Sequence, residues 1–152
     1  MCGITGIVSW NGVDADGGIS LLVDRLHHRG PDDSGLYRSS DGSCLLGHTR
    51  LSILDLSPAG HQPMIDPLTR NVIVFNGEIY NFQELRARCE AQGDRFQSRS
   101  DTEVILAMYR RYGTRCLRYL RGMFALAIYD EAIRGSGQLF LARDRVGKKP
   151  LN

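Results

Sequence analysis

The sequence predicts an α+β fold in which antiparallel sheets form the inner layers and helices form the outer ones. Residues 123–129 are almost wholly apolar, and residues 138–142 are nearly so. A strand with one wet face alternates apolar and polar residues, so continuous apolar strands indicate a sheet that is covered on both faces. Helical patterns at 82–93 and 100–113 provide such a cover. The length of 152 residues fits one domain of this kind.

Hydrophobic spacing and turn residues define the elements of the first half of the chain. Apolar residues surround small ones just after the N-terminus, and they later recur at helical spacing until a Gly-Pro pair ends the helix. In chain order, we expect a strand at 3–10, a helix from Ile19 to Gly30-Pro31, strands at 35–38 and 43–51 around a turn at 40–42, and a loop at 56–69.

Capping residues mark the helices of the second half. Asn81, with Glu84 three residues later, is expected to cap the first helix, and Ser100 with Glu103 forms a capping box for the second. In chain order, we expect a short strand at 71–75 that leads into Asn76-Gly77, helices that end at Gly93 and Gly113, and a hairpin of strands at 123–129 and 138–142 with a turn at 134–137.

Composition and charge narrow the function classes. The net charge of +2 is too small to indicate nucleic acid or an anionic membrane as a partner. No apolar stretch approaches the roughly 20 residues of a membrane span, and the start lacks the basic leader of a secretory signal. The four cysteines lie far apart, without the paired spacing of a zinc site or the pattern of a secreted disulfide scaffold. We therefore expect a cytoplasmic protein with reduced thiols and no metal site.

Cys2 is the first candidate for chemistry because only Met1 precedes it. A small second residue permits removal of Met1, and the mature chain would then carry a free α-amine beside a thiol. Nucleophile and base would belong to one residue, as in hydrolases that use an N-terminal threonine. The alternative, from this residue alone, is that Cys2 is a small buried apolar side chain.

The segment Phe-Asn-Gly-Glu at 75–78 is the second candidate. Acyl transfer needs donors that point at the developing oxyanion, and Asn76 can supply a side-chain amide while Gly77 supplies a backbone N–H. The same residues also fit an Asn-Gly turn at the end of a strand. The residue types alone leave both interpretations open.

Eight collinear segments resemble the N-terminal glutaminase domain of class II glutamine amidotransferases, in the asparagine synthetase branch. The segments are MCGITGIV at 1–8, HHRGPDDSG at 27–35, GHTRLSILDLS at 47–57, GHQPM at 60–64, FNGEIYNFQELR at 75–86, SDTEVIL at 100–106, LRGMFALAIYD at 120–130 and ARDRVGKKPL at 142–151. Together they cover nearly the whole sequence.

The resemblance implies one class II glutamine amidotransferase domain at 1–152, with an N-terminal nucleophile hydrolase fold. This fold is a four-layer αββα sandwich with antiparallel sheets. By the same resemblance, Cys2 attacks the side-chain amide of glutamine and gives a γ-glutamyl thioester and ammonia, and water then releases glutamate. Asn76 and Gly77 match the oxyanion hole of the family.

The resemblance also implies how glutamine is held. Arg50 matches the ligand of the α-carboxylate, for which a guanidinium fork is well suited. The segment that lines the site is matched by Leu51, Ser52, Ile53 and Leu54, and the acids that bind the α-ammonium are matched by Glu78 and Asp101. Asp101 by itself has a simpler interpretation, because an acid in the first turn of a helix stabilises that helix.

The sequence departs from the family pattern at its end. In the family, the motif R-D-x-x-G-x-K-P-L continues with two tyrosines and further strands, whereas this sequence ends at Leu151-Asn152. We therefore expect a domain that is incomplete at its C-terminus, with an unpaired sheet edge that predicts either marginal stability or association, for example as a homodimer. No cofactor is expected in this domain. ATP and Mg²⁺ would belong to the missing synthetase domain or subunit, which would accept the ammonia for asparagine synthesis.

Two alternatives to this function stay open. One is a non-catalytic fragment of a split or truncated amidotransferase that binds glutamine or another subunit. The other keeps the fold but changes the substrate, since other hydrolases with an N-terminal cysteine cleave different amides.

Overall fold

The computed structural model describes residues 1–9, 16–131 and 137–152. Most of the turn expected at 134–137 lies outside these ranges, as does Trp10 at the end of the first expected strand. Within the described residues, no helix is long and apolar enough to cross a membrane.

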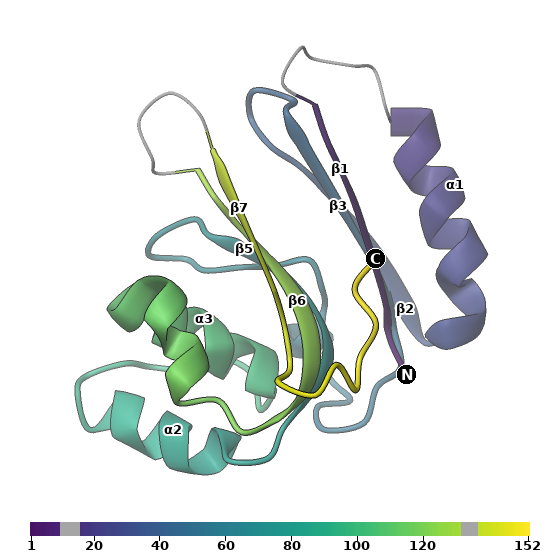
Figure 1. Cartoon of the computed structure of the whole chain (residues 1–152). Coiled ribbons are helices and arrows are strands. Elements are labelled where there is room, and N and C mark those ends of the chain that lie inside the picture. The colour runs from purple at the N-terminus through teal and green to yellow at the C-terminus, as the bar shows by residue number, and fades with distance from the viewer. Residues whose placement is uncertain (10–15, 132–136) are drawn as a thin grey trace.

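The first sheet contains three antiparallel strands in the order β1-β3-β2. These strands span Gly3–Val8 (β1), Asp33–Arg38 (β2) and Cys44–Arg50 (β3), and helix α1 spans Asp16–Leu26. Helix α1 lies along the outer face of this sheet (Figure 1) and buries Ile19 and Val23 there. A 3₁₀ turn at His27–Arg29 then leads to Gly30, so the α-helix ends at Leu26, four residues before the predicted stop at Gly30.

The second sheet contains four antiparallel strands in the order β4-β5-β6-β7. The strands are Met64–Ile65 (β4), Val72–Ile79 (β5), Gly122–Asp130 (β6) and Gln138–Arg143 (β7). Helices α2 (Phe82–Glu90) and α3 (Asp101–Tyr112) cover the outer face of this sheet (Figure 1), and further 3₁₀ turns occur at Pro58–Gly60 and Gly113–Arg118.

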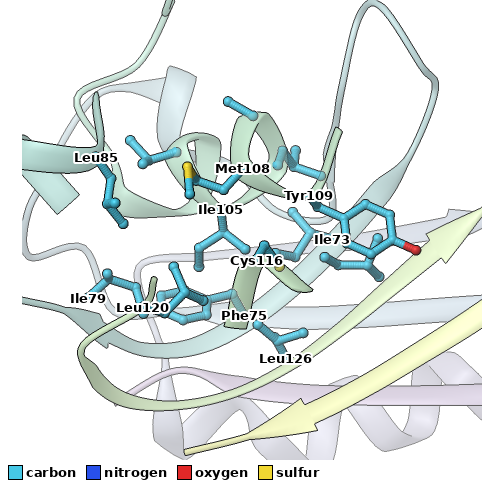
Figure 2. Close-up of a cluster of buried hydrophobic side chains, with 14 of the residues drawn as sticks. Ile73, Phe75, Ile79, Leu85, Ile105, Met108, Tyr109, Cys116, Leu120 and Leu126 are labelled. Atoms are coloured by element: carbon cyan, nitrogen blue, oxygen red, sulfur yellow. The ribbon is translucent and has the colours of Figure 1, made fainter. Parts of the chain in front are cut away.

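The two sheets face each other, so the layers run helix, sheet, sheet, helices (Figure 1). The larger hydrophobic cluster fills the space between the second sheet and helices α2 and α3. Figure 2 shows Phe75 and Leu126 of the sheet against Ile105 and Met108 of α3. A smaller cluster lies between the sheets. Strand β6 contributes to both clusters, which confirms the prediction that its continuous apolar sequence is covered on both faces.

Strand β5 corrects one interpretation of the Asn-Gly pair. The strand was expected to end at Phe75, but it continues to Ile79, and Asn76 and Gly77 pair in register with Ala125 and Phe124 of β6. The pair is therefore part of a strand and not a turn. Packing against β6 decides this conformation, because the local propensity of Asn-Gly favours a turn.

The helix caps are partly as predicted. Ser100 accepts the N–H of Glu103, as a capping residue should, but the Glu103 carboxylate accepts the N–H of Ser98 and not that of Ser100. Asn81 precedes α2 without capping it, because its side chain donates to the carbonyl of Tyr119 and accepts the N–H of Arg121 instead. The expected loop at 56–69 also contains the two residues of β4.

Candidate active site

A cavity of about 110 Å³ brings together segments that are far apart in the sequence. Its walls come from the chain start, the end of β3 with the following loop, the middle of β5 and the start of α3. Nine of the ten predicted site residues line it: Cys2, Arg50, Leu51, Ile53, Leu54, Asn76, Gly77, Glu78 and Asp101. Ser52 is the exception, and its N–H donates to the Asp32 carboxylate outside the cavity.

A larger cavity, of about 420 Å³, lies beside β4 and α3 and contains none of the predicted residues. Its charged groups largely neutralise one another, because Arg110 pairs with both Asp66 and Asp94. It holds no cysteine. The smaller cavity is therefore the better candidate for chemistry.

Cys2 lies at the entrance to β1, with its sulfur against the segment that follows β3. Its Sγ accepts the N–H of Leu51 at 3.4 Å, and its carbonyl accepts the Nε–H of Arg29 at 3.1 Å. The next residue, Gly3, donates its N–H to the hydroxyl of Thr49. A side chain at Gly3 would place its Cβ 2.6 Å from that hydroxyl, so only glycine lets the chain start approach β3 this closely.

The other three cysteines are in a different environment. Cys44, Cys89 and Cys116 are fully buried, whereas Cys2 is partly exposed. Burial raises the pKa of Cys44 to about 12 and that of Cys116 to about 11, and it also raises the pKa of Cys89. These three thiols stay protonated at neutral pH, so Cys2 is the one cysteine suited to act as a nucleophile.

The backbone of β5 directs the N–H of Gly77 away from β6. In an antiparallel pair, successive N–H groups point to opposite edges of a strand. The N–H groups of Phe75 and Ile79 are bound by the side chains of Gln62 and Asp101, so both point to the edge opposite β6. Gly77 lies midway and shares their direction. None of the described side chains accepts its N–H, and Gly77 lines the cavity.

Side chains on β5 alternate between its two faces. Val72 and Val74 belong to the cluster between the sheets, so Asn76 and Glu78 face the same side, toward the sheet that contains β1 and β3. Asn76 is buried, and Glu78 is partly exposed at the cavity. This arrangement places an amide donor and a carboxylate on the side of β5 where Cys2 lies.

Arg50 ends β3, and its guanidinium is held by backbone oxygens. Nη1 donates to the carbonyl of Ser57 at 3.0 Å, and Nη2 donates to the carbonyl of Asp55. A Cβ at Gly60 would lie 2.2 Å from Nη2, so the absence of a side chain there leaves room for the guanidinium. Within the part of the chain that the structure describes, no acid forms an ion pair with Arg50. Its positive charge can therefore attract a ligand carboxylate.

Asp55 organises the loop that carries these carbonyls. Its Oδ1 accepts the hydroxyl and the N–H of Ser57, and its Oδ2 accepts the N–H of Arg99 at 2.7 Å. The hydrogen bond from the Ser57 hydroxyl, followed by that from Arg99, lowers the pKa of Asp55. The loop is thus fixed by a carboxylate that remains ionised at neutral pH.

Asp101 is both a helix-start residue and a wall of the cavity. It begins α3, and its Oδ2 accepts the N–H of Ile79 at 2.9 Å. Burial raises its pKa from 3.8 to about 6, and the neighbouring charge of Glu78 adds to this rise. Asp101 can therefore stabilise the start of α3 and also serve as a ligand at the cavity. A bound ammonium would favour the ionised form of its carboxyl group.

This raised pKa predicts a pH-dependent effect of Asp101→Asn on stability. Since folding raises the pKa, Asp101 stabilises the fold at pH values below 3.8, and that contribution is lost as the pH rises through about 6. At pH 8 the free energy of unfolding of the asparagine variant is expected to exceed that of wild type by on the order of 2 to 3 kcal/mol, so the variant unfolds at a higher temperature, and this advantage is lost near pH 4. Thermal unfolding followed by circular dichroism at both pH values measures the difference. If the asparagine variant is more stable than wild type by the same amount at both pH values, the raised pKa of Asp101 is contradicted.

Polar residues that the sequence interpretation did not name as site residues also line the cavity, among them Asp55, Gln62, Thr102 and Lys149. Lys149 arrives from the segment after β7, which crosses to the chain start (Figure 1), and its ammonium contacts the Met1 sulfur. Gln62 lies within the motif GHQPM, so the motif was a signal for it. Lys149 lies within the motif ARDRVGKKPL in the same way, but its place at the cavity depends on the path of the last segment. Among the residues that the structure describes, no group of three or more His, Cys, Asp or Glu side chains could hold a metal ion.

Comparison with solved structures identifies the class of fold. Glutamine phosphoribosylpyrophosphate amidotransferase from B. subtilis superposes with a TM-score of 0.67 over 94% of this chain and 36% of its own, at 22% sequence identity. The fold, with two facing antiparallel sheets between helical layers, is that of the N-terminal nucleophile hydrolases. The chain matches the glutamine amidotransferase domain family over residues 1–152, and it belongs to that family.

Among curated proteins, the chain is similar to glutamine-hydrolysing asparagine synthetases. It is 40% identical to a putative asparagine synthetase 2 of Methanocaldococcus jannaschii, over 99% of this chain and 31% of that protein. It is 42% identical to asparagine synthetase B of Escherichia coli, over 99% of this chain and 26% of that protein. The chain thus spans about a quarter to a third of the length of these relatives.

Proposed function

We propose that this chain hydrolyses the side-chain amide of glutamine with Cys2 as the nucleophile. The observation that carries the proposal is the single cavity that gathers the Cys2 thiol, the N–H of Gly77 and the cationic Arg50 beside two acids. These groups match the needs of the substrate, because glutamine has an amide at one end and a zwitterion at the other.

The zwitterionic end would be held by charge. Arg50 binds the α-carboxylate, and Glu78 with Asp101 binds the α-ammonium. The backbone from Leu51 to Leu54 lines the site between the arginine and the thiol. A charge-assisted pair is stronger than a neutral hydrogen bond, so these contacts both orient the substrate and select against amides that lack the zwitterion.

The proposed reaction uses Cys2 as both nucleophile and base. After removal of Met1, the α-amine of Cys2 takes the thiol proton as Sγ attacks the amide carbon, and it delivers the proton to the departing nitrogen as ammonia leaves. The Asn76 amide and the Gly77 N–H stabilise the oxyanion that forms in between. Water then adds to the γ-glutamyl thioester, the C–S bond breaks, and glutamate and the free thiol are regenerated.

The names of the relatives support a proposal for the destination of the ammonia. Their names describe glutamine-hydrolysing asparagine synthetases, so we propose that a synthetase domain or subunit accepts the ammonia and makes asparagine from aspartate. ATP and Mg²⁺ would act in that domain. The residues of the cavity described above need no cofactor for the hydrolysis itself.

Removal of Met1 is expected to be essential for this activity. In the structure the Met1 side chain lines the cavity, and a peptide bond to Met1 turns the base into an amide. A preparation that begins at Cys2 should release glutamate from glutamine, and one that retains Met1 should be at least about a hundredfold slower. Intact mass identifies the two forms, and a coupled glutamate assay measures the rates.

The same two preparations separate the alternatives. Equal rates for both forms would exclude the α-amine as the base. Stabilisation against heat by glutamine, without turnover in either form, would favour a non-catalytic glutamine-binding module.

A further inference from the structure

Gln62 occupies a central place in the site, although the proposed reaction assigns it no role. Its side chain is only 5% exposed and lies in the segment between Arg50 and β4. Buried amides need partners for both their oxygen and their nitrogen. The two partners of Gln62 belong to two different walls of the cavity.

The first partner lies on the exposed edge of β5. Strand β4 pairs with Val72 and Ile73, and no strand among the described residues pairs with this edge from Phe75 onward. The Oε1 of Gln62 accepts the N–H of Phe75 at 2.7 Å and continues the hydrogen bonding along β5 beyond Met64, the first residue of β4. Two positions later, the N–H of Gly77 remains open to the cavity.

The second partner lies at the start of α3. The Nε2 of Gln62 donates to the hydroxyl of Thr102 at 3.2 Å, and Thr102 is itself buried. Thr102 directly follows Asp101, whose carboxylate binds the N–H of Ile79. The start of α3 is therefore hydrogen-bonded to β5 on both sides of Gly77. One connection runs from Thr102 through Gln62 to Phe75, and the other runs from Asp101 to Ile79.

We propose that Gln62 is a positioning residue that holds in place the edge of β5 carrying the Gly77 N–H and sets the spacing of this N–H from the Asp101 carboxylate. The Gln62 amide binds the N–H of Phe75 in place of a neighbouring strand. The N–H of Gly77 is then free for substrate, between the bound N–H groups of Phe75 and Ile79. This role rests on the proposed glutaminase function, in which Gly77 donates to the oxyanion and Asp101 binds the substrate ammonium.

Gln62→Met removes both hydrogen bonds at similar volume and tests this role. We expect kcat for glutamine hydrolysis to fall by about 10- to 100-fold, because oxyanion donors act in the transition state. The rate at which iodoacetamide alkylates Cys2, followed by peptide mass, should stay within about twofold of wild type, since the nucleophile is untouched. Wild-type kcat and KM in a folded Gln62→Met protein would overturn the proposal.

Hydrogen exchange gives a readout that does not depend on activity. In Gln62→Met the Phe75 amide should exchange at least about tenfold faster, while the Ile79 amide keeps its protection through Asp101. Equal protection of Phe75 in both proteins would contradict the positioning role. If the exchange changes as expected but wild type releases no glutamate, the proposed function fails and the positioning by Gln62 does not.

A matched pair at Thr102 covers the case in which Gln62→Met does not fold. Thr102→Ser keeps the hydroxyl, whereas Thr102→Val removes it at nearly constant shape. We expect Thr102→Val to raise KM for glutamine several-fold through Asp101, and Thr102→Ser to stay close to wild type. The same KM for both variants would overturn the link between Gln62 and the helix start.

Discussion

Replacing Cys2 by alanine is expected to lower kcat for glutamine hydrolysis by more than about a thousandfold. The variant keeps the α-amine but has no sulfur to form the γ-glutamyl thioester, and the remaining groups can only hold the substrate. Glutamine should still stabilise the variant against heat, since Arg50, Glu78 and Asp101 are unchanged. Glutamate release and thermal unfolding with and without glutamine measure the two effects.

Cys44→Ala is the matched control for this experiment. Cys44 is fully buried between the sheets, and burial raises its pKa to about 12, so its thiol is not expected to react. The control is expected to lose some stability, because removal of the sulfur leaves a small cavity, but its kcat should stay near that of wild type. Equal glutamate release by wild type and Cys2→Ala would contradict the thioester mechanism.

Replacing Arg50 by alanine is expected to raise KM for glutamine by about 10²- to 10³-fold. The α-carboxylate would lose its cationic partner, and the loss would be felt in the ground state as well as in the transition state. Since binding weakens equally in both states, kcat for bound glutamine should change much less than KM. Initial rates over a wide range of glutamine concentrations separate the two parameters.

Two further variants show whether the rise in KM comes from the lost charge of Arg50 or from disturbance of the loop at residues 55–57. The Arg50 guanidinium also supports the carbonyls of Asp55 and Ser57, so its loss can disturb residues 55–57. Ser57→Ala removes the Ser57 hydroxyl from Asp55 but keeps the charge of Arg50, and it should raise KM only a few-fold. Arg50→Lys keeps a charge without the fork and should fall in between. An unchanged KM in Arg50→Ala would indicate a different amide substrate.

The layered fold could be predicted because the spacing of apolar residues in the sequence indicates which faces of a strand or helix are buried. The continuous apolar run of β6 indicated a sheet with two covered faces, and its residues do enter both hydrophobic clusters. Ser100 was recognised as a cap because its hydrogen bond to Glu103 is local. Asn81 shows the limit of such reasoning. Asparagine is a common residue at helix N-caps, but the side chain of Asn81 binds Tyr119 and Arg121, which are near it only in the folded chain.

The candidate site was found by resemblance more than by residue chemistry. Cys2 and Asn76-Gly77 each had a simpler interpretation, and Asp101 was explained equally well by the helix start. The structure gathers nine of the ten proposed residues around one cavity and leaves Ser52 outside it. It also adds Gln62 and Lys149, whose contribution depends on where the segment before β4 and the segment after β7 run.

Local spacing and side-chain chemistry were enough to predict the apolar strands and the amphipathic helices, but they left two interpretations open for Cys2 and for Asn76-Gly77. Strand pairing in the folded chain was needed to show that Asn76 and Gly77 lie within a strand and that the Gly77 N–H faces the cavity. The physical reason is strand register: pairing with β6 fixes which N–H groups are bound, and the side chains of Gln62 and Asp101 occupy the groups on either side of the one left free.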